Sequence, residues 1–197
     1  MGDIIQSAVD EFLEKGYENT SMEAIARRAG ISKGGLYHHF KSKDDILLLA
    51  NQQLYEPIAA MRREAESMPS APQALSWYMK SYIEYWRSHK TEVVFSSLSM
   101  AKMLELPALE QMYENYTEGY LSFFQNLYER GIAGGEFKPH PTHESAMILM
   151  TALDGIVMYL VIDQRLEPEE VYSVFRKNFI EAYRVKRKTR VRSKQGL

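Results

Sequence analysis

A short segment near the N-terminus is rich in basic residues, which can bind a negatively charged partner such as a nucleic acid. Between Ala24 and Lys43 the sequence has five Lys or Arg residues and no acidic residue, although the whole 197-residue chain has a net charge of −2. Local charge of this kind, and not the total, determines where a protein attracts phosphate groups. The segment therefore predicts a local site for a negatively charged partner.

Two adjacent glycines, Gly34 and Gly35, lie inside this segment in a stretch that is otherwise expected to be helical. Each costs a helix about 1 kcal/mol relative to alanine, and a helix without Cβ atoms can approach a phosphate or a base edge closely. Around them, Lys33, Tyr37 and His38 supply a cation and two hydrogen-bonding rings. The alternative, that the glycines merely end a loop, stays open on these residues alone.

Two short helices are needed to position these residues. Apolar residues recur at helical spacing between positions 22 and 29, and Thr20 with Glu23 forms a capping-box signature before them. Ser32 can cap a second helix, over about residues 33–40. Two helices joined by a short glycine-containing turn have the spacing of a helix-turn-helix.

The rest of the chain also has helical periodicity, and no period-2 run bounded by hairpin turns indicates a strand. After a fourth helix that begins with the capping pair Ser42 and Asp45, the expected long helices are Gln73–Ser88, Thr91–Leu104, Ala108–Arg130, Thr142–Asp163 and Pro168–Lys188. We therefore predict an all-α fold of about nine helices.

The stretch from Ala146 to Ile162 is almost entirely apolar. It is shorter than the roughly 20 residues of a membrane span, and Asp154 interrupts it. A helix that is apolar all round must be covered on more than one side. We expect the helices at 142–163 and 168–188 to form a homodimer interface, with a fully buried central helix as the alternative and a membrane span disfavoured.

The stretch from Thr20 to Lys43 resembles the DNA-binding signature of the tetracycline-repressor (TetR) family, with the sequence TSMEAIARRAGISKGGLYHHFKSK. The similarity covers about the first 50 residues; beyond them only the number and length of helices are similar. The resemblance implies a helix-turn-helix DNA-binding domain at 1–46 and a helical ligand-sensing and dimerisation domain at 47–197. It implies a homodimeric repressor that binds double-stranded operator DNA and is released by a small molecule, which we expect from the aromatic and methionine residues described below to be lipophilic or aromatic.

The resemblance also implies which residues contact DNA. Lys33 and Gly34 would face base edges, Tyr37 and His39 would contact phosphates, and Lys43 would meet a phosphate at the N-terminus of its helix. Hydroxyl and backbone groups of three further residues would bind the DNA backbone. The full set is Thr20, Ser21, Ser32, Lys33, Gly34, Gly35, Tyr37, His38, His39 and Lys43.

Aromatic and methionine side chains are concentrated in the three helices after residue 73. Such residues usually form core, but Tyr and Trp keep a polar tip and Met adapts its shape, so they also suit a lipophilic pocket. Both interpretations stay open. The candidate effector contacts are Trp77, Tyr82, Trp86, Phe95, Met103, Tyr116 and Tyr120.

Several other functions are disfavoured by what the sequence contains. There is no cysteine, which excludes disulfides and thiolate metal sites, and the first residues do not resemble a signal peptide, so a cytoplasmic protein is expected. No catalytic motif or cofactor-binding loop is present, so we predict neither an enzyme nor a cofactor. His140 and His143 have a metal-ligand spacing with only Glu144 nearby, and the basic run 184–194 is more typical of a solvated helix end than of a DNA-binding arm.

Overall fold

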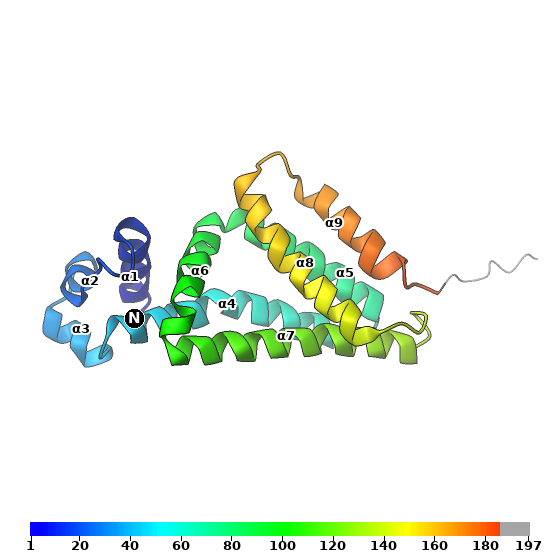
Figure 1. Cartoon of the computed structure of the whole chain (residues 1–197), viewed down its shortest axis with the longest axis horizontal. Coiled ribbons are helices and arrows are strands. Elements are labelled where there is room, and N and C mark those ends of the chain that lie inside the picture. Colours follow the sequence, from blue (N-terminus) through cyan, green and yellow to red (C-terminus); the bar gives the residue numbers. More distant parts are fainter. Residues whose placement is uncertain (186–197) are drawn as a thin grey trace, which may run out of the picture.

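The computed structural model describes residues 1–185, and within this range the protein contains nine α-helices and no extended strand (Figure 1). The predicted all-α fold is confirmed. The α-helices are α1 (Gly2–Lys15), α2 (Met22–Arg28), α3 (Lys33–His39), α4 (Lys43–Ser67), α5 (Ala71–Ser88), α6 (Lys90–Lys102), α7 (Pro107–Ala133), α8 (Thr142–Ile162) and α9 (Pro168–Arg176). A 3₁₀ turn, η1 (Met103–Glu105), follows α6, and a π-helical turn, η2 (Lys177–Glu181), follows α9.

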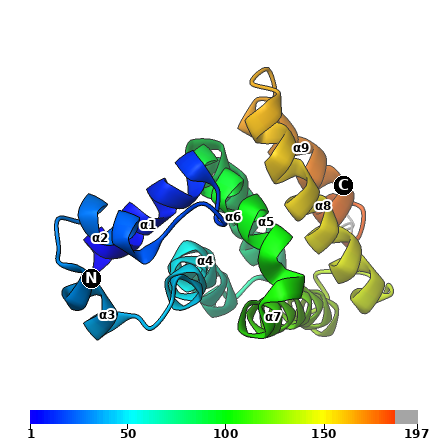
Figure 2. The same cartoon turned by 60° about the vertical axis from the view of Figure 1, so that its left-hand side comes forward.

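Helices α1, α2 and α3 pack together as a small N-terminal head at one end of the molecule (Figures 1 and 2). Each of the three helices contributes a completely buried side chain to the core of the head, namely Phe12, Ile25 and Leu36. Gly16 ends α1 with a φ of 80°, which favours glycine, and its N–H donates to the carbonyl of Phe12 at 2.9 Å. Ser32 caps α3 as predicted, accepting from the N–H of Gly35.

The cap of α2 differs from the prediction. Ser21, and not Thr20, precedes the helix, and its side-chain oxygen accepts from the N–H of Ala24 at 3.2 Å. The Thr20 side chain instead points into the head, where its hydroxyl lies 2.9 Å from the carbonyl oxygen of Gly16. Only Thr20 has a glutamate three residues later, but Ser21 is also a preferred N-cap residue, and packing selects it.

Helix α4 connects the head to the rest of the molecule without a break. Its capping box, formed by Ser42 and Asp45, is present as predicted. The helix runs 25 residues, through the expected domain boundary at 46/47, and packs first on α1 and then on α5, α6 and α7. A continuous helix can transmit a displacement along its length, which a flexible linker cannot.

The larger part of the molecule is built from α5 to α9 around the second half of α4. Helix α8 packs on both α5 and α7, and α9 packs on α5. Figures 1 and 2 show α8 and α9 side by side at the outside of this layer, away from the head. The core between the helices is dominated by aromatic rings, of which Tyr78, Tyr120 and Phe124 are almost completely buried.

The last helix is shorter than predicted. We expected it to continue to Lys188, but α9 ends at Arg176 and the π-helical turn ends at Glu181. The chain then pairs with residues 136–138: the N–H of Lys138 donates to Tyr183 and the N–H of Val185 donates to Glu136. Backbone pairing therefore replaces the last helical turns. The rest of the basic run, 186–194, lies outside the described residues.

Helix α8 is apolar on its outer face as well as its inner one. Leu149, Leu153 and Leu160 are completely buried, whereas Ile148, Tyr159 and Ile162 are more than half exposed. The helix is long and apolar enough to cross a membrane by length and composition. Its inner face packs into this fold, so a core helix explains the same composition.

Candidate nucleic-acid interface and ligand cavities

Helix α3 presents one polar face to solvent. Leu36 anchors its inner side with no exposed surface, while Lys33, Gly34 and Tyr37 lie on the outer side, and Tyr37 is 44% exposed. In Figure 1 this helix lies at the end of the molecule opposite α9. The structure thus displays the predicted recognition helix outward, with its glycine-bearing first turn free.

The Lys33 ammonium is held by two neighbours. It forms an ion pair with Glu23 of α2, and it lies 5.8 Å from the centroid of the Tyr37 ring. The hydrogen bond to Glu23 is the main reason that the pKa of Lys33 is raised. A lysine anchored on both sides presents its charge at a defined place.

The two glycines have different local environments. A Cβ added at Gly34 would meet nothing within 4 Å, so packing within this chain does not require glycine there. A Cβ at Gly35 would lie 3.3 Å from the Ser32 hydroxyl oxygen that caps the helix. Glycine at position 35 therefore leaves room for the cap, whereas at position 34 no contact within this chain would oppose a side chain.

Two predicted DNA contacts are engaged inside the protein. Thr20 is only 3% exposed, and its hydroxyl donates within the head. The ammonium of Lys43 lies 2.8 Å from the carbonyl oxygen of Tyr17 and 3.3 Å from that of Thr20, and 4.3 Å from the centroid of the Tyr17 ring. These side chains secure the α1–α2 turn to the start of α4, so a phosphate contact by either side chain would have to replace these internal bonds.

The remaining candidates are accessible. Ser21 and Ser32 are exposed, and each hydroxyl can still donate while its oxygen caps a helix. His38 and His39 are exposed at the end of α3, with ring centroids 5.3 Å apart. Together with the outer face of α3 they form one continuous polar surface.

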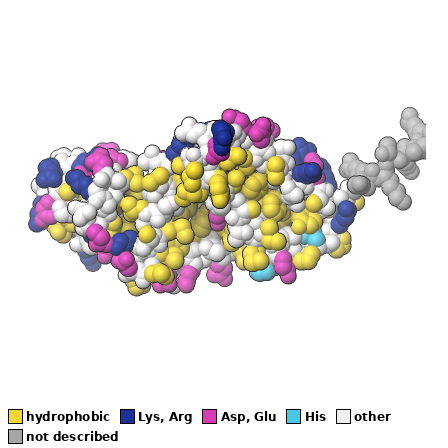
Figure 3. All heavy atoms as spheres, turned by 45° about the horizontal axis from the view of Figure 1, so that its top comes forward, with side chains coloured by type: hydrophobic (Ala, Val, Ile, Leu, Met, Phe, Trp, Pro, Cys, Tyr) yellow, Lys and Arg dark blue, Asp and Glu magenta, His cyan; other side chains and the backbone are white. Residues whose placement is uncertain are grey.

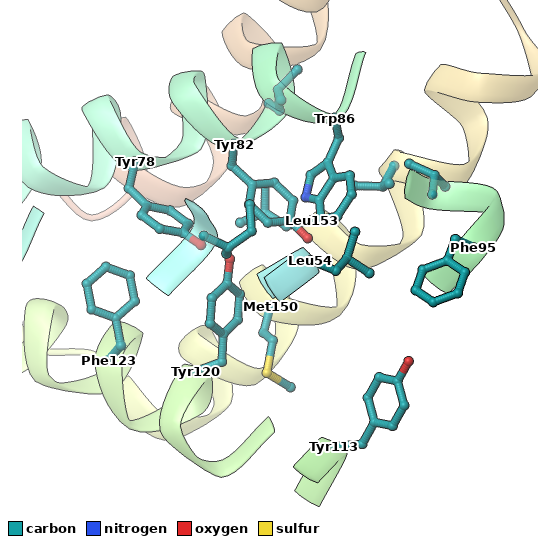
Figure 4. Close-up of a cluster of buried hydrophobic side chains, with 14 of the residues drawn as sticks. Leu54, Tyr78, Tyr82, Trp86, Phe95, Tyr113, Tyr120, Phe123, Met150 and Leu153 are labelled. Atoms are coloured by element: carbon teal, nitrogen blue, oxygen red, sulfur yellow. The ribbon is translucent and has the colours of Figure 1, made fainter. Parts of the chain in front are cut away.

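The larger part of the molecule contains two adjoining cavities. The first, of about 220 Å³, lies among α4 to α8; the second, of about 350 Å³, lies between α4 and α7. Tyr55 of α4 and Tyr116 of α7 line both cavities, and their ring centroids are 4.5 Å apart. Figure 4 shows the buried hydrophobic cluster to which part of these linings belongs, with Tyr82 and Trp86 extending from α5 and Tyr113 and Tyr120 from α7.

The seven candidate effector contacts separate into three groups. Tyr82 and Trp86 line the first cavity, Tyr120 lines the second, and Tyr116 lines both. Phe95 lies at a third cavity of about 210 Å³ that includes residues of α1 and α4. Trp77 and Met103 line none of these three cavities and pack against the core instead, which corrects their assignment.

The first cavity is aromatic with one acidic group. Asp154 of α8 lines it and accepts a hydrogen bond from the Tyr82 hydroxyl at 3.0 Å. Asp154 is itself exposed to solvent where it lines the cavity, and partial desolvation of its carboxyl group, opposed by this hydrogen bond, raises its pKa. Burial, with Asp154 as the next cause, raises the pKa of Tyr82 well above its ordinary value. A mostly apolar cavity with a few polar groups is the usual form of a small-molecule site.

Sequence reasoning missed three residues of the cavities. Tyr55 and Arg62 lie on α4, for which no effector contact was predicted, and Asp154 was noted only as a break in an apolar run. A single acidic residue within an otherwise apolar helix was the available signal, because such a residue rarely persists without a function or a partner. Nothing in the local sequence distinguished Tyr55 from an ordinary core residue.

A buried polar network joins α4, α6 and α7 beside the first cavity. The Asn51 amide nitrogen donates to the Ser99 hydroxyl at 3.0 Å, and the Tyr113 hydroxyl donates to the Asn51 carbonyl oxygen at 3.2 Å. Asn51 and Ser99 are completely buried. One turn further along, the Tyr55 and Ser96 hydroxyls lie 2.7 Å apart. The network fixes the relative positions of the three helices around the cavity.

Comparison with known families identifies both parts of the chain. Residues 4–50 match the family described as bacterial regulatory proteins, tetR family, and residues 91–183 match the QacR-like protein C-terminal region. The chain belongs to the TetR family. It is therefore a DNA-binding transcriptional regulator, and regulators of this family bind operator DNA, dimerise and bind small-molecule effectors.

Individual TetR-family proteins are similar over most of the chain. The fatty acid metabolism regulator protein of Bacillus subtilis is 26% identical over 168 residues, which cover 83% of this chain and 85% of the relative. PfmR from Thermus thermophilus has a TM-score of 0.74 at 23% identity, covering 93% of this chain and 99% of PfmR. FadR from Bacillus subtilis, solved in complex with stearoyl-CoA, has a TM-score of 0.70 at 22% identity, covering 91% and 97%. These structural similarities establish the shared fold.

Proposed function

We propose that this TetR-family protein is a cytoplasmic homodimeric repressor whose affinity for operator DNA falls when a lipophilic effector occupies the cavities among α4 to α8. The observation that carries the proposal is the direct connection from these cavities to the head. Tyr55 of α4 lines both cavities, and the same helix begins against the head at Lys43. An effector that changes the packing around Tyr55 therefore acts on the element that supports the head.

A second connection runs through α6. Ser96 and Met100 of α6 line the first cavity, and Lys102 at the end of the same helix forms an ion pair with Glu18 in the α1–α2 turn. A ligand shifts the equilibrium between two arrangements only by its difference in affinity for them. An effector that binds better when α4 and α6 are displaced would reduce operator affinity by that difference.

For operator binding we propose the outer face of α3 as the element that enters the major groove. Lys33 and Gly34 would meet base edges, while Tyr37 and His39 would meet phosphates. Gly35 would lie close to the groove, and His38 would contact either a base edge or the DNA backbone. The Ser21 and Ser32 hydroxyls would donate to the DNA backbone. We assign residues 1–46 to this DNA-binding domain and residues 47–197 to effector sensing and dimerisation.

We infer that the dimer forms through α8 and α9. The exposed apolar side chains on this side include Ile148, Tyr159 and Ile162 of α8 and Val174 of α9, each more than half exposed. Figure 3 shows hydrophobic side chains spread over the middle of the face that is turned toward the viewer. At Gly155, in the centre of α8, a Cβ would meet nothing within 4 Å in the monomer, so a second helix can approach closely there. Pairing these helices across a two-fold axis would give a four-helix bundle.

The chemistry of the cavities favours a ligand with a large apolar part. Their linings combine aromatic rings with methionines such as Met100, Met112 and Met150. Two of the similar proteins are connected with fatty acids by name: one is called a fatty acid metabolism regulator, and FadR was solved in complex with stearoyl-CoA. We therefore propose a ligand with a long acyl or alkyl chain as the effector class.

Operator selection with purified variants tests the DNA-binding assignment. Lys33→Ala should relax the sequence preference at the position that it faces, because a base contact is worth about 1–3 kcal/mol of discrimination. Tyr37→Phe should weaken binding to all selected sequences to a similar extent, because a phosphate contact carries no sequence information. Lys138→Ala, which removes an exposed cation between α7 and α8, far from the head, serves as the control. Unchanged binding and preference in both head variants would refute the assignment.

A further inference from the structure

The two cavities are separated by side chains alone. Tyr55 and Tyr116 line both cavities and pack against each other. Because these two rings are shared by both linings, their rotation would join the cavities, and for Tyr55 this requires breaking its 2.7 Å contact with the Ser96 hydroxyl. A single ligand longer than either cavity could then occupy both.

The α4–α7 cavity contains a cation with no internal partner. Arg62 lines this cavity and, within residues 1–185, makes neither an ion pair nor a hydrogen bond. Glu56, the acidic residue that lines the same cavity, is paired with Arg63 at 2.7 Å. The partly buried Arg62 guanidinium thus remains available for a ligand that enters from this side.

Gly119 of α7 makes space for this guanidinium. A Cβ at position 119 would lie 3.0 Å from Nη1 of Arg62, closer than most real contacts. The arginine can therefore lie against the α7 backbone and direct its planar group along the cavity. A guanidinium has five N–H donors in a fork that matches carboxylate and phosphate oxygens.

The other cavity has the opposite charge. Asp154 lines it, and no Lys, Arg or His is among the residues that line it in the described part of the chain. Tyr116 lies between the two charges: burial raises its pKa and Asp154 adds to that effect, whereas Arg62 lowers it. An anionic group is attracted at the Arg62 end and repelled at the Asp154 end.

We propose that Arg62 binds an anionic head group of the effector in the α4–α7 cavity, and that the apolar chain passes between Tyr55 and Tyr116 into the cavity that contains Asp154. This inference rests on the proposed lipophilic effector and adds its charge and its orientation. The head group is an acid that offers oxygen acceptors, either a carboxylate or a phosphate.

Matched ligands with the same twelve-carbon chain separate these possibilities. Binding of dodecanoate, dodecanoyl-CoA, dodecanol and dodecylammonium to the full-length protein would be measured by calorimetry below the concentrations at which micelles form. Release of a labelled operator would be measured in parallel. At least one of the two anionic ligands should bind about tenfold or more tightly than dodecanol, because hydrogen bonds to charged groups are among the strong ones. Tighter binding of dodecanoate than of dodecanol would identify a carboxylate site. If only dodecanoyl-CoA binds more tightly than dodecanol, the site recognises a phosphate.

Variants then assign the effect to one residue. In Arg62→Gln the advantage of the anionic ligand over dodecanol should disappear, and in Arg62→Lys part of it should remain. Arg63→Gln removes the same charge at a neighbouring residue that does not line the cavity, and it also removes the partner of Glu56. It therefore serves as a stringent control, because it shows how far a charge change near the cavity, without loss of Arg62, alters ligand binding. Asp154→Asn should not weaken binding of the anionic ligand.

Three results would overturn the inference while leaving a lipophilic effector intact. They are an anionic advantage that survives Arg62→Gln, equal binding of dodecanol and both anionic ligands, and tightest binding of dodecylammonium that is lost in Asp154→Asn. If no ligand of any charge binds or releases the operator, the proposed effector class itself fails, and this inference fails with it.

Discussion

Replacement of Asn51 tests whether the buried polar network holds α4, α6 and α7 together. Asn51 has no exposed surface and bonds across helices to Ser99 of α6 and Tyr113 of α7. Leucine has a similar volume but cannot make either bond. We predict that Asn51→Leu lowers the free energy of unfolding, although it adds an apolar side chain to the core.

The magnitude follows from the bonds that are lost. Two interhelical hydrogen bonds are worth about 2 kcal/mol together, and a buried polar group left without its partner, such as the Tyr113 hydroxyl, costs about 1–3 kcal/mol more. Burying the apolar part of leucine recovers about 1 kcal/mol. The net destabilisation should be about 2–4 kcal/mol.

Urea unfolding followed by circular dichroism, at one fixed protein concentration, measures this difference. Tyr113→Phe alone should cost about 1–3 kcal/mol, because it leaves the buried Asn51 carbonyl oxygen without this donor. In the double variant the two losses should not add, because removal of the tyrosine hydroxyl also removes the group that Asn51→Leu leaves unpaired; a coupling of about 1 kcal/mol is expected. Strict additivity, or a wild-type midpoint for Asn51→Leu, would refute the reasoning.

Three further predictions can be tested, two by the same unfolding assay and one by measuring the oligomeric state. Gly131→Ala should destabilise the protein by about 3 kcal/mol, because its Cβ would lie 2.2 Å from Cδ2 of the buried Phe137 ring; a change below 1 kcal/mol would contradict this. The pKa of Glu11 is lowered, mainly by the hydrogen bond from Lys15. The ionised Glu11 side chain therefore stabilises the fold at pH values above the ordinary glutamate pKa, and this stabilisation is lost as the pH falls through the lowered pKa of the folded state. Glu11→Gln should therefore destabilise the protein near pH 7 and lose this effect in acid, and an equal effect at both pH values would contradict the assignment. Ile162→Asp should convert the dimer to monomer in light scattering and weaken operator binding, and an intact dimer would exclude this face.

Local sequence was sufficient for the elements of the head and for the helical class of the whole chain. Capping residues such as Ser32 and Ser42, and a glycine at the end of α1, act on backbone groups only a few residues away. Their effect is therefore visible in the sequence itself. The start of α2 shows the limit: the capping-box pattern favoured Thr20, but Thr20 is buried in the head and the neighbouring hydroxyl of Ser21 caps the helix.

The cavities depended on contacts that the sequence does not display. Tyr55 and Tyr116 are separated by 60 residues in the chain, yet their rings pack together, and Arg62 becomes a cavity residue because a glycine on another helix leaves it space. Trp77 and Met103 have the same composition signal as Tyr82 but face the core.

The sequence by itself determined the helices, their caps and the basic, glycine-bearing segment, because these arise from interactions between near neighbours along the chain. Only the tertiary structure decided which aromatic residues line a cavity, which lysine is tied to backbone carbonyls, and where opposite charges face each other across two tyrosines. Those properties depend on how helices distant in sequence approach one another, and helical periodicity fixes the inner face of a helix but not its partner.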